Sequence, residues 1–77
     1  MVTVYTTPSC PGCMLTKLSL NRHKSPYEVV DLSQDKDAHD YVTSLGYREA
    51  PVVVVDENTH WAGFRAERIK QLAETVE

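Results

Sequence analysis

The sequence predicts one small α/β domain in which four short strands form a mixed sheet flanked by three helices. Two observations support this prediction. The chain has 77 residues, which is enough for a single domain. Its apolar residues alternate with period two in some segments and recur with helical spacing in others, in the order βαβαββα. Because we find no repeats, linkers or low-complexity segments, we expect one domain over residues 1–77.

The chain opens with a strand that leads into a helix. Residues 2–6 alternate with period two, which is typical of a strand. Residues 7–9 break this pattern and deliver Cys10 to the start of a helix. Pro11 suits the first helical turn because its missing N–H costs nothing there. Three apolar residues share one face of this helix, namely Met14, Leu15 and Leu18.

A second strand and a second helix follow. The first helix is expected to end near residues 24–26, and residues 27–32 read as a strand. Ser33 is the expected N-cap of the next helix, and Gly46 sits where a C-terminal cap belongs. The helical spacing i, i+3, i+4, i+7 is carried by four residues, Ala38, Tyr41, Val42 and Leu45. Among these, Tyr41 is expected in the core.

The last third of the sequence predicts a β-hairpin followed by a final helix. Residues 52–55 are four consecutive valines, which indicate a buried strand. A turn over residues 56–59 leads to a short returning strand over residues 60–62. The final helix is indicated by Ile69, Leu72, Ala73 and Val76. A right-handed βαβ unit followed by a hairpin and a helix is the arrangement of the thioredoxin fold.

Composition narrows the possible functions. The formal net charge of −3 gives no electrostatic reason to expect nucleic-acid binding, and no apolar run is long enough to cross a membrane. The N-terminus lacks the basic and apolar segments of a signal peptide. Two cysteines in a chain without such a segment suggest a reducing compartment. We therefore expect a cytoplasmic monomer that binds neither nucleic acid nor membrane.

The two cysteines form the motif Cys10-Pro11-Gly12-Cys13. Two thiols at this spacing, at a strand-to-helix junction, can open and close a disulfide with little backbone movement. Cys10 is the expected nucleophile, because unpaired N–H groups and the helix dipole favour a thiolate at a helix N-terminus. Cys13 lies one turn later and is the expected resolving thiol. Pro11 and Gly12 complete the redox motif.

Two other interpretations of the cysteine pair are weaker. A structural disulfide over so short a loop would remove little entropy from the unfolded chain. A zinc site would need histidines, but the chain has no second cysteine pair, and its three histidines, at positions 23, 39 and 60, lack ligand spacing. We therefore predict no metal and no cofactor.

Two further segments are expected to shape the site. A proline at position 51 is awkward unless it begins the valine strand. In the predicted fold such a proline is commonly cis, faces the disulfide and presents backbone to an extended peptide substrate. Trp61 and Phe64 flank Gly63, which permits close backbone approach, so they are expected to line a substrate groove. Two alternatives stay open, a trans proline at the strand start and aromatics that are simply core.

The whole pattern resembles the NrdH-redoxins, which are small glutaredoxin-like proteins. The resemblance rests on Val-Tyr-Thr before the cysteines and on the segments 40–42, 45–47, 50–54, 60–65 and 68–69. It implies electron donation to the large subunit of class Ib ribonucleotide reductase and recharging by thioredoxin reductase with NADPH. It also implies that Cys10 attacks the substrate disulfide and that Pro51 is the cis-proline beside it.

The resemblance leaves alternatives for partner choice. The chain lacks the double glycine and following aspartate with which glutaredoxins usually hold glutathione. Pro11, however, is typical of glutaredoxins, whereas the resembled family usually carries a pair such as Val-Gln between its cysteines. Ala66 also replaces that family's proline. A glutathione-linked glutaredoxin is therefore the second hypothesis, and a metal or iron–sulfur binding redoxin is the third.

Overall fold

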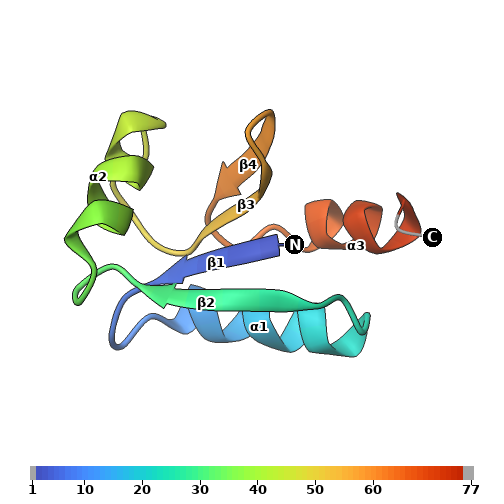
Figure 1. The fold of residues 1–77 in the computed structure, drawn as a ribbon. Helices are drawn as coiled ribbons and strands as arrows, with labels where there is room; N and C mark the ends of the chain where they lie inside the picture. The colour runs from blue at the N-terminus through green and yellow to red at the C-terminus, as the bar shows by residue number, and fades with distance from the viewer. Residues whose placement is uncertain (1, 76–77) are drawn as a thin grey trace.

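A computed structural model describes residues 2–75 of the chain, and the side chains of residues 2–72 (Figure 1). The elements are β1 (Val2–Thr6), α1 (Pro11–Arg22), β2 (Tyr27–Asp31), α2 (Lys36–Ser44), β3 (Val52–Asp56), β4 (Thr59–Ala62) and α3 (Ala66–Thr75). The sheet order is β2-β1-β3-β4, with β1 parallel to β2 and antiparallel to β3. This arrangement confirms the thioredoxin fold, with a four-stranded mixed sheet and three helices.

The sheet separates two hydrophobic clusters, because alternate residues of each strand point to opposite faces. On one face, Val53 of β3 packs with residues of α1 and α3, including Leu20 and Ile69. On the other face, Val52 and Val54 pack with α2. Figure 1 accordingly shows α1 and α2 on different sides of the sheet. The four-valine segment is therefore buried from both sides, as its composition predicted.

Helix α1 forms where it was expected, but its predicted apolar face is not the face that packs. The side chains that α1 buries are those of Cys13, Thr16 and Leu20. Met14, Leu15 and Leu18 are exposed. The spacing of these three residues indicated a helix correctly, whereas the side that meets the sheet was decided by the register between α1 and the strands.

The N-cap of helix α2 lies two residues after the predicted one. Asp35 is its N-cap, and the Asp35 carboxylate accepts a hydrogen bond from the Ala38 N–H at 3.0 Å. Ser33, predicted to be this cap, instead donates from its N–H and its hydroxyl to the Asp31 carboxylate. The prediction of Ser33 was therefore wrong, and the cap is an aspartate, which stabilises a helix N-terminus as well as a serine does.

The C-terminal end of α2 agrees with the prediction for Gly46, which has a φ of +95°. The Gly46 N–H donates to the Thr43 carbonyl, and the Tyr47 N–H donates to the Val42 carbonyl. This pair of bonds is the Schellman arrangement, which favours glycine at the left-handed position. Tyr41, expected in the core, is exposed on the surface of α2, with its ring beside that of Tyr5.

The predictions for the last helix fall partly outside the described region. Ile69 is fully buried and Leu72 packs against the same cluster. The side chain of Ala73 and the whole of Val76 lie outside the described residues. Within residues 2–75, none of the helices is both long and apolar enough to cross a membrane.

Candidate active site

The two cysteines are joined by a disulfide at the N-terminus of α1, with their Cα atoms 5.3 Å apart. Cys10 is the N-cap residue, and its sulfur accepts a hydrogen bond from the Cys13 N–H at 3.1 Å. The Cys10 side chain is half-buried, whereas Cys13 is only 2% exposed. A partner can therefore reach the sulfur of Cys10 far more easily than that of Cys13.

The loop before the disulfide is held by the central strand β1. The Thr6 carbonyl at the end of β1 accepts a hydrogen bond from the Leu32 N–H at 2.8 Å. Ser9 then adopts a positive φ of 58°, which turns the chain into α1. Because β1 is paired on both sides, the point at which the chain leaves the sheet is fixed, and so is the position of Cys10.

The peptide bond between Ala50 and Pro51 is cis, which agrees with the prediction made for this fold. Pro51 is fully buried, and its carbonyl accepts a hydrogen bond from the Gly63 N–H at 2.8 Å. A Cβ atom on Gly12 would lie 3.1 Å from Cδ of Pro51. The structure thus brings together Gly12, Pro51 and Gly63, three of the predicted site residues, although they come from distant parts of the sequence.

The two aromatic residues predicted to line a groove lie in different environments. Trp61 is 6% exposed and belongs to the core cluster between the sheet, α1 and α3. The Arg68 guanidinium lies 4.9 Å from the centroid of the Trp61 ring. Phe64 is 39% exposed, one residue after Gly63, whose φ is +85°. The groove interpretation of Trp61 is therefore replaced by a core role, and Phe64 remains available to a partner.

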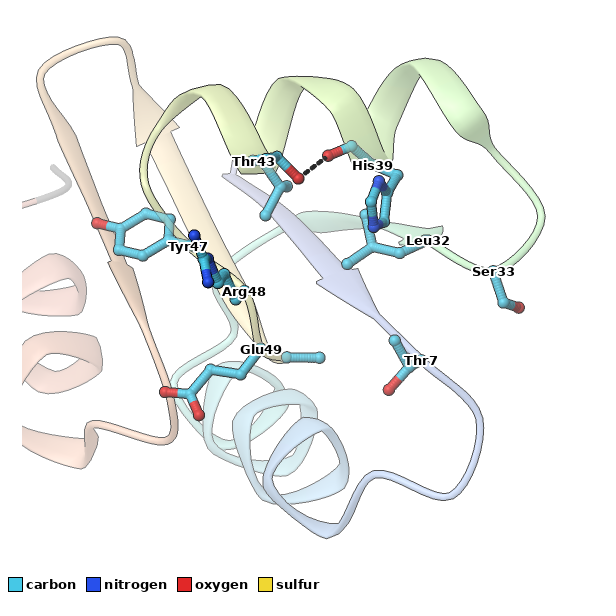
Figure 2. Close-up of a pocket in the computed structure, with 10 residues that line it drawn as sticks. Thr7, Leu32, Ser33, His39, Thr43, Tyr47, Arg48 and Glu49 are labelled. Carbon is cyan, nitrogen blue, oxygen red and sulfur yellow. Dashed lines mark hydrogen bonds between the residues drawn. The ribbon is translucent and has the colours of Figure 1, made fainter.

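A cleft of about 300 Å³ between α2, the end of β1 and the loop before Pro51 was not predicted (Figure 2). It runs from Thr7, which follows β1, to Ala50, which precedes Pro51. Residues of α2, including His39, line it, as do Arg48 and Glu49 of the loop between α2 and β3. The charged pair Arg48-Glu49, just ahead of Ala50-Pro51, was the available signal, but sequence spacing alone does not show which helix faces that loop.

Tyr47 and His60 form a second feature that sequence reasoning missed. The Tyr47 hydroxyl lies 2.7 Å from Nδ1 of His60, and the two rings meet edge to face. The contact joins the loop before Pro51 to strand β4. Thirteen residues separate the two partners in sequence, so no local pattern indicated the contact.

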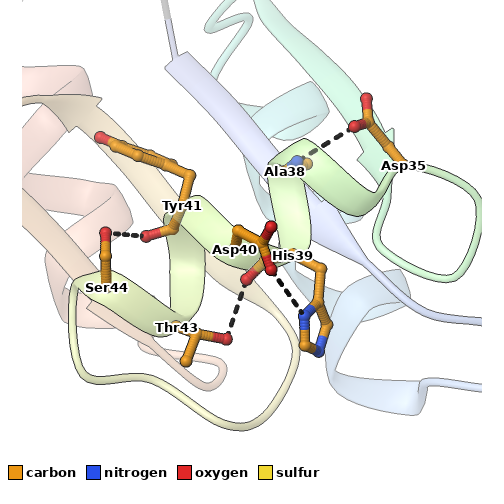
Figure 3. A network of polar contacts seen from close by, with 7 residues as sticks. All are labelled: Asp35, Ala38, His39, Asp40, Tyr41, Thr43 and Ser44. Atoms are coloured by element: carbon orange, nitrogen blue, oxygen red, sulfur yellow. Dashed lines mark hydrogen bonds and ion pairs between the residues drawn. The ribbon is translucent and has the colours of Figure 1, made fainter.

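The polar side-chain contacts of α2 next to the cleft stay within the helix (Figure 3). The Thr43 hydroxyl donates to the His39 carbonyl, and Nδ1 of His39 lies 3.9 Å from the Asp40 carboxylate. Within the part of the chain that the structure describes, no group of three His, Cys, Asp or Glu residues could hold a metal ion.

Comparison with known proteins places the chain among small redox proteins. The family model described as glutaredoxin matches residues 2–61. The chain is 32% identical to the glutaredoxin-like protein NrdH of Salmonella typhimurium, over 96% of this chain and 90% of that protein. It is 35% identical to the gene 56 protein of Mycobacterium phage L5, over 92% of this chain and 70% of that protein.

Solved structures show the same likeness. The structure of NrdH-redoxin from Escherichia coli matches with a TM-score of 0.86 at 28% identity, and the match covers 92% of each chain. That protein is described as glutaredoxin-like with a thioredoxin-like activity profile.

Proposed function

The chain belongs to the glutaredoxin family, as one of its NrdH-like members, and we propose that it donates electrons to class Ib ribonucleotide reductase. We further propose that thioredoxin reductase recharges it with electrons from NADPH. The family and the Cys10–Cys13 disulfide make it a thiol–disulfide oxidoreductase. The observation that carries the proposal is this disulfide, with a half-buried Cys10 and a buried Cys13, in a chain similar to NrdH over nearly its full length.

The proposed reaction follows from the different exposure of the two sulfurs. The Cys10 thiolate attacks one sulfur of the partner disulfide, which forms a mixed disulfide and releases the other partner sulfur as a thiol. The Cys13 thiolate then attacks the Cys10 sulfur, closes the Cys10–Cys13 disulfide and releases the second partner thiol. Two electrons and two protons pass to the partner. The reductase returns them by the reverse exchange, since its dithiol is oxidised as the Cys10–Cys13 disulfide is reduced.

The residues around Cys10 suggest how a substrate is held. The Ala50–Pro51 backbone beside the motif offers an extended edge to a peptide chain. Gly63 holds the Pro51 carbonyl, and the exposed Phe64 ring offers an apolar contact at the same end of the sheet. We assign substrate contact to Gly63, to Phe64 and to the backbone that leads into Pro51, and a supporting role to the buried rings of Pro51 and Trp61. Pro11 and Gly12 lie between the two sulfurs, and a cytoplasmic monomer is part of the same proposal.

A glutathione-linked glutaredoxin is the second candidate, and one observation favours it. Pro11 follows the nucleophile at the first position of α1, as is typical of glutaredoxins. The thioredoxin-like activity profile described for the E. coli relative supports the first candidate instead. The two candidates differ in the reductant that each predicts.

A side-by-side assay separates the candidates. The oxidised protein is incubated either with NADPH and a bacterial thioredoxin reductase or with glutathione, glutathione reductase and NADPH, and NADPH consumption is followed with a disulfide acceptor. We expect rapid turnover with thioredoxin reductase and little with glutathione. The Cys10→Ser variant should be inactive in both systems, and Cys13→Ser should lack dithiol turnover. Efficient turnover with glutathione alone would select the second candidate.

A further inference from the structure

Three large apolar side chains stand exposed on the helix that carries the dithiol. Met14 is 62% exposed, Leu15 47% and Leu18 61%. They recur at i, i+1 and i+4, so they form one continuous surface, which we call the α1 stripe. At 100° per residue, the α1 stripe lies on the side of the helix opposite to the buried residues Cys13 and Leu20. It therefore faces away from the sheet.

The fold gains little from the α1 stripe. Single exposed apolar residues are ordinary, but three neighbouring ones on one helix face are the pattern of an interaction surface. Polar residues would serve equally well as helix formers at these positions. The packing of α1 instead relies on Leu20 and its neighbours. Among the described residues, the α1 stripe therefore has no packing role in the fold.

The α1 stripe is continuous with the point where a partner must touch the protein. Pro11 is exposed and lies three and four residues before Met14 and Leu15, so it extends the same surface to the start of the helix. Cys10 is the cap of that helix. Thiol–disulfide exchange passes through a mixed disulfide, in which the partner is bonded to the sulfur of Cys10. The partner's surface consequently covers the N-terminal end of α1.

The dimensions bring the whole α1 stripe within reach of that partner. With a rise of 1.5 Å per residue, Leu18 lies roughly 12 Å along α1 from Cys10. A standard protein interface covers about 800 Å² on each partner, which corresponds to a patch roughly 30 Å across. An interface centred on Cys10 is therefore wide enough to reach Leu18.

We propose that the α1 stripe is a docking surface for proteins that carry an apolar segment next to the disulfide that Cys10 attacks. The α1 stripe thus selects the substrate by its flanking residues. The inference rests on the exposed α1 stripe and on the dithiol chemistry. It does not depend on which enzyme reduces this protein, nor on whether ribonucleotide reductase is its physiological substrate. The proposed occupant of the α1 stripe is the protein whose disulfide Cys10 attacks. A second copy of this chain is the alternative occupant, and the test distinguishes the two.

The test compares two synthetic disulfide-closed peptides with the same Cys-Gly-Ser-Cys loop. One peptide carries Leu-Phe-Leu on both sides of the loop and the other carries Ser-Gln-Ser. The protein is reduced with dithiothreitol and desalted, and the second-order rate of each single-turnover reaction is measured. We expect the wild type to reduce the apolar peptide about tenfold faster than the polar one, since burial of one or two apolar side chains is enough for that ratio.

The matched variants are Met14→Gln with Leu18→Gln, and Tyr41→Gln as control. The double variant should bring the ratio of the two rates close to one. Tyr41 is also an exposed apolar residue but lies on α2, across the sheet from α1, so its variant should keep the wild-type ratio. Melting temperatures show that each variant is folded.

Three results would overturn the proposal. The double variant could keep the wild-type ratio, or it could lose both rates equally, which would show an effect on the dithiol and not on docking. Size-exclusion chromatography could also show a wild-type dimer that the double variant dissolves, which would make a second copy the occupant. The assay contains neither thioredoxin reductase nor glutathione, so failure of the proposed electron donor role would leave its outcome unaffected.

Discussion

Gly12 leaves no room for a side chain on the side of α1 that meets the loop of Pro51. Any other residue at position 12 would carry a side chain there. In the structure, that side chain would meet the Pro51 ring, with its Cβ only 3.1 Å from Cδ. Pro51 is fully buried and cannot move aside without displacing its neighbours. Gly12 therefore lets the dithiol helix and the cis-proline loop approach each other.

Replacing Gly12 by valine should lower the free energy of unfolding by about 1 kcal/mol. Overpacking costs about 1–3 kcal/mol, which exceeds the roughly 0.5–1 kcal/mol that a helix gains when glycine is replaced. Urea denaturation of the oxidised protein measures the change. Met14→Val, at an exposed position of the same helix, should cost less than about 0.5 kcal/mol. A Gly12→Val variant as stable as the wild type would show that the contact with Pro51 is loose.

Asp31 provides a pH-dependent prediction. The Ser33 hydroxyl and the Ser33 N–H both donate to its carboxylate, at 2.6 and 2.9 Å. These bonds favour the charged form and hold the pKa of Asp31 below its ordinary value of 3.8, the hydroxyl being the larger cause. Their contribution to stability is therefore complete above about pH 4 and is lost as the pH falls through the lowered pKa.

Ser33→Ala should raise the pKa of Asp31 towards its ordinary value, because it removes the larger cause. An NMR titration of the Asp31 carboxyl carbon measures this shift. Ser44→Ala is the control, since the Ser44 hydroxyl donates to the Tyr41 carbonyl and has no contact with Asp31. An unchanged titration in Ser33→Ala would assign the lowered pKa to another cause.

Helix α1 illustrates how an element can be predicted correctly although its sequence does not show which face packs against the sheet. Its apolar spacing and its proline-containing first turn were visible in the sequence. Its buried face includes Thr16, a polar residue, while the exposed face carries Met14 and two leucines. Periodicity can show that a helix has an apolar face. Helix α1 has apolar residues on two opposite faces, and its contact with the sheet decides which of the two is buried.

Replacing each of two leucines of α1 by alanine should change the free energy of unfolding by very different amounts. Leu20 is fully buried in the core cluster, so Leu20→Ala should cost about 2–5 kcal/mol of unfolding free energy. Leu18 is exposed, and Leu18→Ala should cost less than about 0.5 kcal/mol. Both variants are compared by urea denaturation. Similar losses at the two positions would contradict the orientation of α1 described above.

In the whole molecule, the loop before Pro51 is tied to the β4 side at two points. The Tyr47 hydroxyl contacts His60, and the Pro51 carbonyl accepts the hydrogen bond from the Gly63 N–H. The segment between these points carries Arg48, Glu49 and Ala50, which line the cleft of Figure 2. The shape of this cleft wall therefore depends on contacts between the loop and the β4 side of the sheet.

Tyr47→Phe should lower the free energy of unfolding by about 1 kcal/mol, because it removes the hydroxyl but keeps the ring. A double-mutant cycle with His60→Leu isolates the pair, and we expect a coupling energy of about 1 kcal/mol. Tyr27→Phe, a tyrosine at the edge strand β2, serves as the control. Additive losses in the cycle would show that the hydroxyl and the imidazole contribute independently.

The sequence by itself determined the order of the elements, the thioredoxin fold, the dithiol at the start of α1 and the glycine that ends α2. These features depend on local spacing and on backbone preferences, which a short segment expresses alone. Only the tertiary structure decided that Trp61 is core and Phe64 exposed, that Gly12 meets Pro51, and that the α1 stripe faces solvent. The reason is physical. Each of these outcomes depends on which distant segment lies beside a residue, and that neighbour is set by sheet order and helix register, which exist only in the folded chain.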